Sequence, residues 1–194
     1  MFDRLSIVAV IIAMLSSLVL LVSQNWRRVV IALSVQYIAV FWLVALTWPV
    51  GLAVVKLVGG WMAGAILASS QQITALGDDK YTGLSGHLFK GVAAIMIWMV
   101  AFSIAPELGI WLPAKMPILW GGMVLIGMGL LQLGMTTRPF RVALGLLTVL
   151  SGFEIIYSSV ETSVLVAGLL VMITLGLALT AAYLLSPSSL EEAP

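Results

Sequence analysis

The sequence predicts an all-α integral membrane bundle of about seven transmembrane helices, with the N-terminus outside and the C-terminus in the cytoplasm. Of its 194 residues 62% are hydrophobic and 9% are charged, whereas a soluble domain is roughly 45–50% apolar. Polar residues, proline and glycine divide the chain into seven apolar stretches of about the 20 residues that cross a bilayer. The basic residues also gather on alternate connections, as the helices of a membrane protein require.

The predicted spans cover residues 5–23, 28–47, 49–69, 88–105, 117–135, 140–159 and 162–185. The first is longer than a signal-peptide core and follows no basic segment, so we expect a retained helix. The run from Val29 to Leu67 is nearly unbroken, and one helix of that length would overshoot the membrane. We therefore divide it at Pro49, because proline fits the first turn of a helix, where its missing N–H has no partner to lose.

The distribution of charge predicts the orientation. With seven spans, the side that carries the C-terminus holds six basic residues: Arg27, Arg28, Lys80, Lys90, Arg138 and Arg141. The opposite side holds Arg4 and Lys115. The positive-inside rule then places the C-terminus in the cytoplasm, and the expected location is the inner (plasma) membrane of a cell, as a multi-pass protein. Trp26, Trp48, Trp111 and Trp120 lie near predicted span ends, where tryptophan is expected to anchor in the headgroup region.

The chain divides into five parts. These are a three-helix N-terminal unit (1–70), a cytoplasmic loop (71–87), a fourth helix with an outer loop (88–116), a three-helix C-terminal unit (117–186) and a polar tail (187–194). A weak internal repeat relates the two three-helix units. Setting Arg28 against Arg141 without gaps places Val29–Ala68 over Val142–Ala181, with a similar apolar pattern in each.

Several classes of function lack the residues that they need. The chain has no cysteine, which excludes thiolate metal sites and a thiol nucleophile. It has no basic run, so nucleic acid is not an expected partner. Its one histidine, His87, has only Asp78, Asp79 and Lys80 close by in sequence. These are too few for a metal site or a catalytic set, so we expect a solvated loop, no metal, no cofactor and no catalytic residue.

Two charges fall well inside spans, Lys56 and Glu154. A charge at membrane depth costs on the order of 3 kcal/mol or more, so it normally faces a bundle interior, finds a partner and marks an ion pathway. Lys56 follows Pro49 by seven residues and Glu154 precedes Glu161 by seven, so each lies roughly 10 Å below the same surface. A Lys56–Glu154 pair is therefore allowed.

Two interpretations of such a pair remain open. It could be a proton relay, since buried carboxylates and lysines are suited to reversible proton transfer. It could instead only fix how helices assemble. Gln36, Tyr37, Thr148, Tyr157 and Thr174 are span residues that could support a relay with hydrogen bonds or water; each alone is also explained as an ordinary polar helix residue.

The region around Glu154 resembles a known family. Residues 141–185 are similar to the last two helices of the K (chain 4L) subunit of bacterial complex I, through Gly152-Phe153-Glu154-Ile155 and the run Leu175–Leu179. With the helices before it, which include Gln36 and Lys56, the chain resembles the E component of group 4 (formate-hydrogenlyase-type) hydrogenases. Met172 stands where the K subunit has a second buried glutamate, and Arg141 lies about one turn further from Glu154 than that family's basic loop.

The resemblance implies a non-catalytic membrane-arm subunit of a complex I-like or group 4 hydrogenase-like respiratory assembly. Such a subunit contributes to proton or sodium translocation coupled to electron transfer elsewhere. Its expected partners are antiporter-like and other membrane-arm subunits, with lipids around them. The alternatives are a stand-alone small transporter or channel, and an assembly scaffold of a membrane complex. As a subunit of an oxidoreductase, the chain needs no catalytic site of its own.

Overall fold

A computed structural model describes the backbone of residues 2–71 and 84–185 and the side chains of 6–70 and 86–185. This part of the chain forms seven helices and no strand: α1 (Phe2–Val22), α2 (Trp26–Val44), α3 (Val50–Gln71), α4 (Leu84–Trp111), α5 (Met116–Gly134), α6 (Pro139–Tyr157) and α7 (Val164–Leu184). The all-helical prediction is confirmed. Helices α2 to α7 are long and apolar enough to cross a membrane, and the part of α1 whose side chains are described, Ser6–Val22, is also apolar. The loop before α4 and the polar tail lie outside the described residues.

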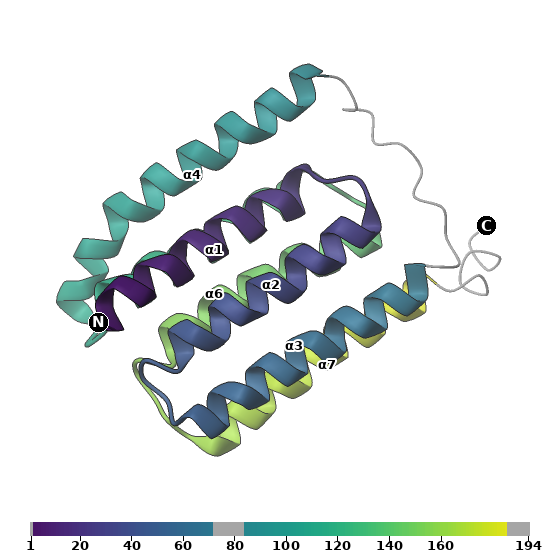
Figure 1. The fold of residues 1–194 in the computed structure, drawn as a ribbon. Helices are drawn as coiled ribbons and strands as arrows, with labels where there is room; N and C mark the ends of the chain where they lie inside the picture. Colours follow the sequence, from purple (N-terminus) through teal and green to yellow (C-terminus); the bar gives the residue numbers. More distant parts are fainter. Residues whose placement is uncertain (1, 72–83, 186–194) are drawn as a thin grey trace.

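The helices form two layers of three, with α4 at one edge (Figure 1). Helices α1, α2 and α3 lie side by side in one layer, and α5, α6 and α7 do so in the other. Each helix of the first layer packs on one helix of the second: α1 on α5, α2 on α6 and α3 on α7. Helix α4 connects the layers and packs against α5 and α1. The first layer corresponds to the predicted N-terminal unit and the second to the predicted C-terminal unit.

The helix bounds agree with the internal repeat. The offset of 113 residues that sets Arg28 against Arg141 carries α2 onto α6 residue for residue, and α3 onto α7 to within one residue. It also carries most of α1 onto α5. The matching helix bounds therefore extend over a whole layer, and the main interlayer contacts pair helices that occupy the same place in the two units.

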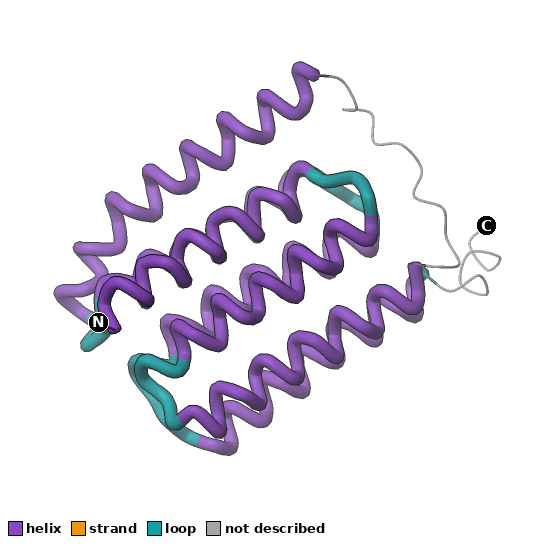
Figure 2. The backbone as a smooth tube through the Cα atoms, viewed as in Figure 1, coloured by secondary structure: helices purple, strands orange, loops and turns teal. Residues whose placement is uncertain are grey.

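The predicted break near Pro49 is confirmed, because α2 ends at Val44 and α3 begins at Val50. The predicted bounds of the fourth helix, 88–105, are too short. Helix α4 starts at Leu84 and passes through Pro106 to Trp111. Proline removes one backbone donor and bends a helix without having to end it, and the axis of α4 bends near this end (Figure 2).

Helices α5 and α6 approach each other along glycines. Gly122 and Gly129 of α5 face Gly152 and Gly145 of α6. A Cβ atom on Gly152 would lie 2.6 Å from the Gly122 oxygen and 2.7 Å from the Ile126 nitrogen, so only glycine fits there. Small residues let helix backbones pack this closely in lipid. The contact, which we call the glycine seam, fixes α6 in place from one side.

Candidate functional site: a buried lysine–glutamate pair between the layers

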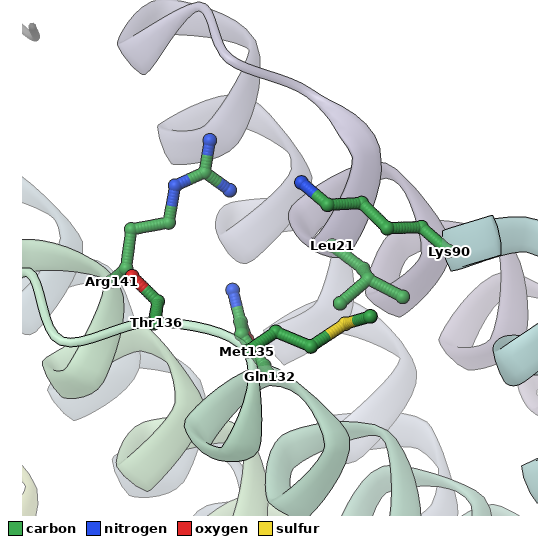
Figure 3. Close-up of a pocket in the computed structure, with 6 residues that line it drawn as sticks. All are labelled: Leu21, Lys90, Gln132, Met135, Thr136 and Arg141. Carbon is green, nitrogen blue, oxygen red and sulfur yellow. The ribbon is translucent and has the colours of Figure 1, made fainter. Parts of the chain in front are cut away.

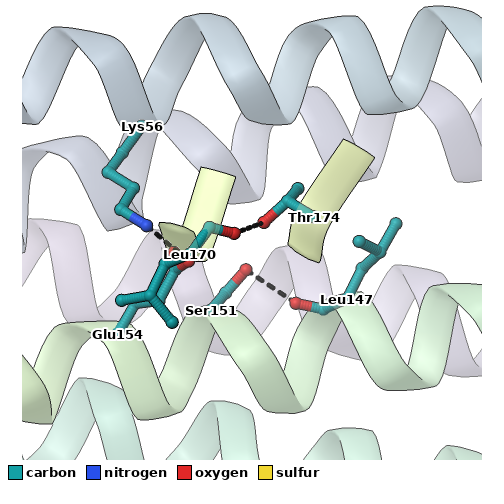
Figure 4. Close-up of polar contacts among 6 residues, drawn as sticks. All are labelled: Lys56, Leu147, Ser151, Glu154, Leu170 and Thr174. Carbon is teal, nitrogen blue, oxygen red and sulfur yellow. Dashed lines mark hydrogen bonds and ion pairs between the residues drawn. The ribbon is translucent and has the colours of Figure 1, made fainter. Parts of the chain in front are cut away.

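The two charges inside the predicted spans meet in the interior. Lys56 projects from α3 and Glu154 from α6, and Lys56 Nζ lies 2.6 Å from Glu154 Oε1 (Figure 4). Each side chain is 2% exposed. The pair joins one layer to the other, because α3 and α6 belong to different three-helix units. The structure thus brings together two residues that are 98 positions apart in the sequence.

Helical spacing places both residues on buried faces. On α3 the buried positions include Ala53, Lys56, Gly60 and Ala63, which recur every three to four residues. This is the periodicity of one side of an α-helix. Lysine at such a position must enter the interior, since its neighbours along that face have almost no exposed area. Charge in this setting requires a partner at hydrogen-bonding distance, which Glu154 supplies.

Polar side chains of α6 continue away from the pair on the same face. The side chains of Thr148, Ser151 and Ser158 are each 1% exposed. Thr148 and Ser151 lie six and three residues before Glu154, and Ser158 lies four residues after it. Their hydroxyl groups donate to backbone carbonyls of α6 one turn earlier. Ser151 and Ser158 were not singled out from the sequence, although their spacing from Glu154 puts them on its helical face.

Residues of α2 approach this polar face. Gln36 donates from Nε2 to Thr148 Oγ1 at 3.5 Å. The Tyr37 hydroxyl interacts with the Ser151 side chain, and its ring lies against Gly60, where any Cβ would overlap it. Of the proposed supporting residues, Gln36 and Thr148 are therefore brought together, at a position six residues before Glu154 on α6. Tyr37 joins them through Ser151.

The other two proposed supporting residues differ from each other. Thr174 is buried on α7, and its hydroxyl donates to the Leu170 carbonyl (Figure 4). Tyr157 does not join the polar group. Its ring stacks on Phe153, with centroids 5.7 Å apart. Phe153 and Tyr157 are four residues apart and lie on the same face of α6, next to the face that carries Glu154. Helix geometry therefore directs the tyrosine ring toward Phe153 and away from the pair.

The two short connections nearest to the pair are tied to each other. Thr47 Oγ1 donates to Ser158 Oγ at 3.0 Å, and Trp48 Nε1 donates to the Glu161 carbonyl oxygen at 2.9 Å. Trp48 is only 4% exposed. The prediction that it anchors in the headgroup region is therefore wrong, because its indole is used to join the α2–α3 connection to the α6–α7 connection.

The opposite end of the bundle holds a second group of polar side chains (Figure 3). Arg141 donates to the backbone carbonyls of Leu20 and Ser23, at 3.2 and 2.6 Å, and Gln132 donates to the Leu20 carbonyl at 3.3 Å. Lys90 lines the same recess. The last carbonyls of a helix have no partner within it and carry partial negative charge. Arg141, which the sequence placed among the loop cations, therefore caps α1 from inside the bundle.

The remaining sequence predictions concern metals and known relatives. No group of three or more His, Cys, Asp or Glu side chains that could hold a metal occurs among the described residues. His87 lies in the first turn of α4, and Asp78, Asp79 and Lys80 lie outside the part of the chain that the structure describes. Comparison with protein-family models, curated proteins and solved structures finds no significant match to this chain.

Proposed function

We propose that the chain is a non-catalytic membrane-arm subunit of a complex I-like or group 4 hydrogenase-like respiratory assembly. In this proposal it lies in the plasma membrane with its C-terminus in the cytoplasm, and it contributes to proton or sodium translocation coupled to electron transfer in other subunits. The observation that carries the proposal is the Lys56–Glu154 pair, 2.6 Å apart and 2% exposed on each side. The sequence resemblance around Glu154 supplies the kind of assembly.

The chemistry of the pair suits a translocating site. Removing a carboxylate and an ammonium from water is costly, and their mutual attraction offsets that cost only while both are charged and in contact. A proton that arrives at Glu154 therefore weakens the contact, and its departure restores it. Coupling between proton occupancy and the contact of two helix layers is what a relay in a larger machine requires.

The outer surface suits assembly in a membrane. Helices α3, α4 and α7 expose large apolar side chains such as Trp61, Phe89, Met96, Leu165 and Met172. Lipid tails, or the apolar helices of neighbouring antiporter-like subunits, would cover such faces. Met172 stands where the K subunit has its second buried glutamate, and the Met172 side chain is 73% exposed. If the assembly uses a second carboxylate at this level, a neighbouring subunit must provide it.

One observation favours the scaffold alternative. The pair joins the two layers, as do the Thr47–Ser158 and Trp48–Glu161 hydrogen bonds nearby. A role confined to fixing the layers would need no proton exchange. The two functions differ in what a neutral replacement of the pair does, since a neutral pair of similar size can pack but cannot carry a charge.

The test uses three variants of the tagged chain in its native membrane: Lys56→Met, Glu154→Gln and the double variant. Glu107→Gln, which alters an exposed carboxylate of α4, is the matched control. Assembly is followed by mild-detergent purification and mass spectrometry, and ion translocation is followed in sealed vesicles. We expect the double variant to assemble with antiporter-like subunits and to lose translocation, while the control keeps both.

Two results would contradict the proposal in different ways. A double variant that assembles and translocates normally would leave the pair with a structural role only. A wild-type chain that purifies alone or as a homo-oligomer would remove the membrane-arm function and favour a stand-alone small transporter.

A further inference from the structure

Gln36 has a buried amide oxygen without a partner. The residue is 0% exposed, and Gln36 Oε1 accepts no hydrogen bond from any described protein group. Its other end, Nε2, reaches Thr148 Oγ1 only at 3.5 Å, which is the long limit for a hydrogen bond. An unpaired buried polar atom destabilises the folded state, because it has given up its hydrogen bonds to water. In proteins such atoms are commonly paired by ordered water.

The surroundings of Gln36 are polar and lead to the ion pair. On α6, Thr148, Ser151 and Glu154 follow one another at intervals of three residues, which is a rise of about 4.5 Å per step. All three side chains are at most 2% exposed. Gln36 and Tyr37 of α2 approach the first two of them. A polar strip about 9 Å long therefore connects the Gln36 amide with Glu154.

The strip ends abruptly on the side away from the pair. Beyond Thr148 the same region of the interior is filled by Leu33, Leu144 and Phe140, which belong to an apolar cluster and are at most 2% exposed. Gln36 thus stands at the last polar position before dry core.

We propose that Gln36 Oε1 holds an ordered water, and that this water with Thr148, Tyr37 and Ser151 extends the Lys56–Glu154 pair into a hydrated strip between α2 and α6. Each α6 hydroxyl along the strip can accept a proton and pass on its own once that proton has turned away from the α6 backbone carbonyl that accepts it. A proton can then move between the water and the Glu154 carboxylate with no net change in the hydroxyl groups. This role in proton movement rests on the function proposed above, whereas the presence of the water does not.

The water is tested by radiolytic hydroxyl-radical labelling of the full chain, purified in mild detergent with any subunits that accompany it. Radicals formed from a bound water modify the side chains beside it. Tyr37 and Phe140 are a matched pair of probes, because both are aromatic and both are 2% exposed. We expect Tyr37 to be modified severalfold faster than Phe140. Equal rates at the two positions would overturn the inference, and this comparison needs no variant.

The Gln36→Leu variant then tests whether Gln36 holds the water. Leucine has a similar size and offers no acceptor, so Tyr37 modification should fall to the level of Phe140. Fast modification of Tyr37 that persists in Gln36→Leu would overturn the assignment to Gln36. The function proposed above fails if ion translocation survives neutralisation of the Lys56–Glu154 pair. That result does not depend on the labelling of Tyr37, so the two failures can be told apart.

Discussion

Helix α6 presents two contrasting faces to its neighbours. Toward α5 it offers Gly145 and Gly152, and the two backbones meet with no room for a Cβ atom. Toward α2 and α3 it offers Thr148, Ser151 and Glu154, which contact polar side chains from the other layer. The glycine seam is backbone packing that tolerates no change of size. The polar face depends on charge and hydrogen bonds. The same helix is therefore held by close packing on one side, while contacts on its other side depend on the protonation of Glu154.

The largest expected effect is on the polar face. Glu154→Gln and Lys56→Met should each destabilise the protein by about 3–5 kcal/mol, because each leaves one buried charge without its partner. The double variant should recover most of this loss. Chemical unfolding of the four proteins in detergent gives the coupling energy. Additive losses in the double variant would mean that the two groups do not stabilise each other.

The glycine seam should respond to one added methyl group. Gly152→Ala should destabilise the protein by about 1–3 kcal/mol, since the new Cβ must displace the α5 backbone. Gly168→Ala on α7 is the matched control: nothing lies within 4 Å of the added atom. Alanine there should be neutral or slightly stabilising because of its higher helix propensity. Equal thermal stabilities for the two variants would contradict the close approach of α5 and α6.

The cap of α1 should have an effect similar in size to that of the glycine seam. Arg141→Met leaves the Ser23 carbonyl without the guanidinium donor and removes one of two donors to the Leu20 carbonyl. A hydrogen bond from a charged group contributes about 1.5–3 kcal/mol. We expect a loss of about that size in unfolding experiments, because the Leu20 carbonyl keeps its Gln132 donor and the Ser23 carbonyl loses the guanidinium. Arg27→Met, at an exposed arginine near the same end, should change stability little. Similar results for both variants would show that the buried contacts of Arg141 contribute nothing.

The tie between the two connections should have the smallest effect. Trp48→Phe keeps an aromatic ring but removes the donor to the Glu161 carbonyl, so a loss of about 0.5–1.5 kcal/mol is expected. Trp111→Phe is the comparison, because Trp111 is 86% exposed. Thermal unfolding in detergent measures both. A larger loss for Trp111 than for Trp48 would reverse the assignment of Trp48 as the interior residue.

The predictable features are those that depend on local sequence. Seven helices and the break before Pro49 follow from runs of apolar residues and from the geometry of proline. The depth of Lys56 and Glu154 follows from counting residues along a helix. Ser151 and Ser158 were missed because neighbouring polar residues were weighed singly, although spacing from Glu154 would have found them. The extension of α4 past Pro106 was missed because proline was treated as an end and not as a bend.

An all-helical, strongly apolar chain, a weak repeat of three helices, and one charge well inside a span of each unit can all be read from the amino-acid sequence. Three features follow from how the helices pack: Lys56 meets Glu154, Tyr157 stacks on Phe153, and Arg141 and Trp48 donate hydrogen bonds inside the bundle. The physical reason is the range of the forces involved. Helix formation and burial depend on residues within a few turns. Pairing across layers depends on which helices stack, and that depends on close contacts between distant residues, such as Gly59 of α3 against Val171 of α7.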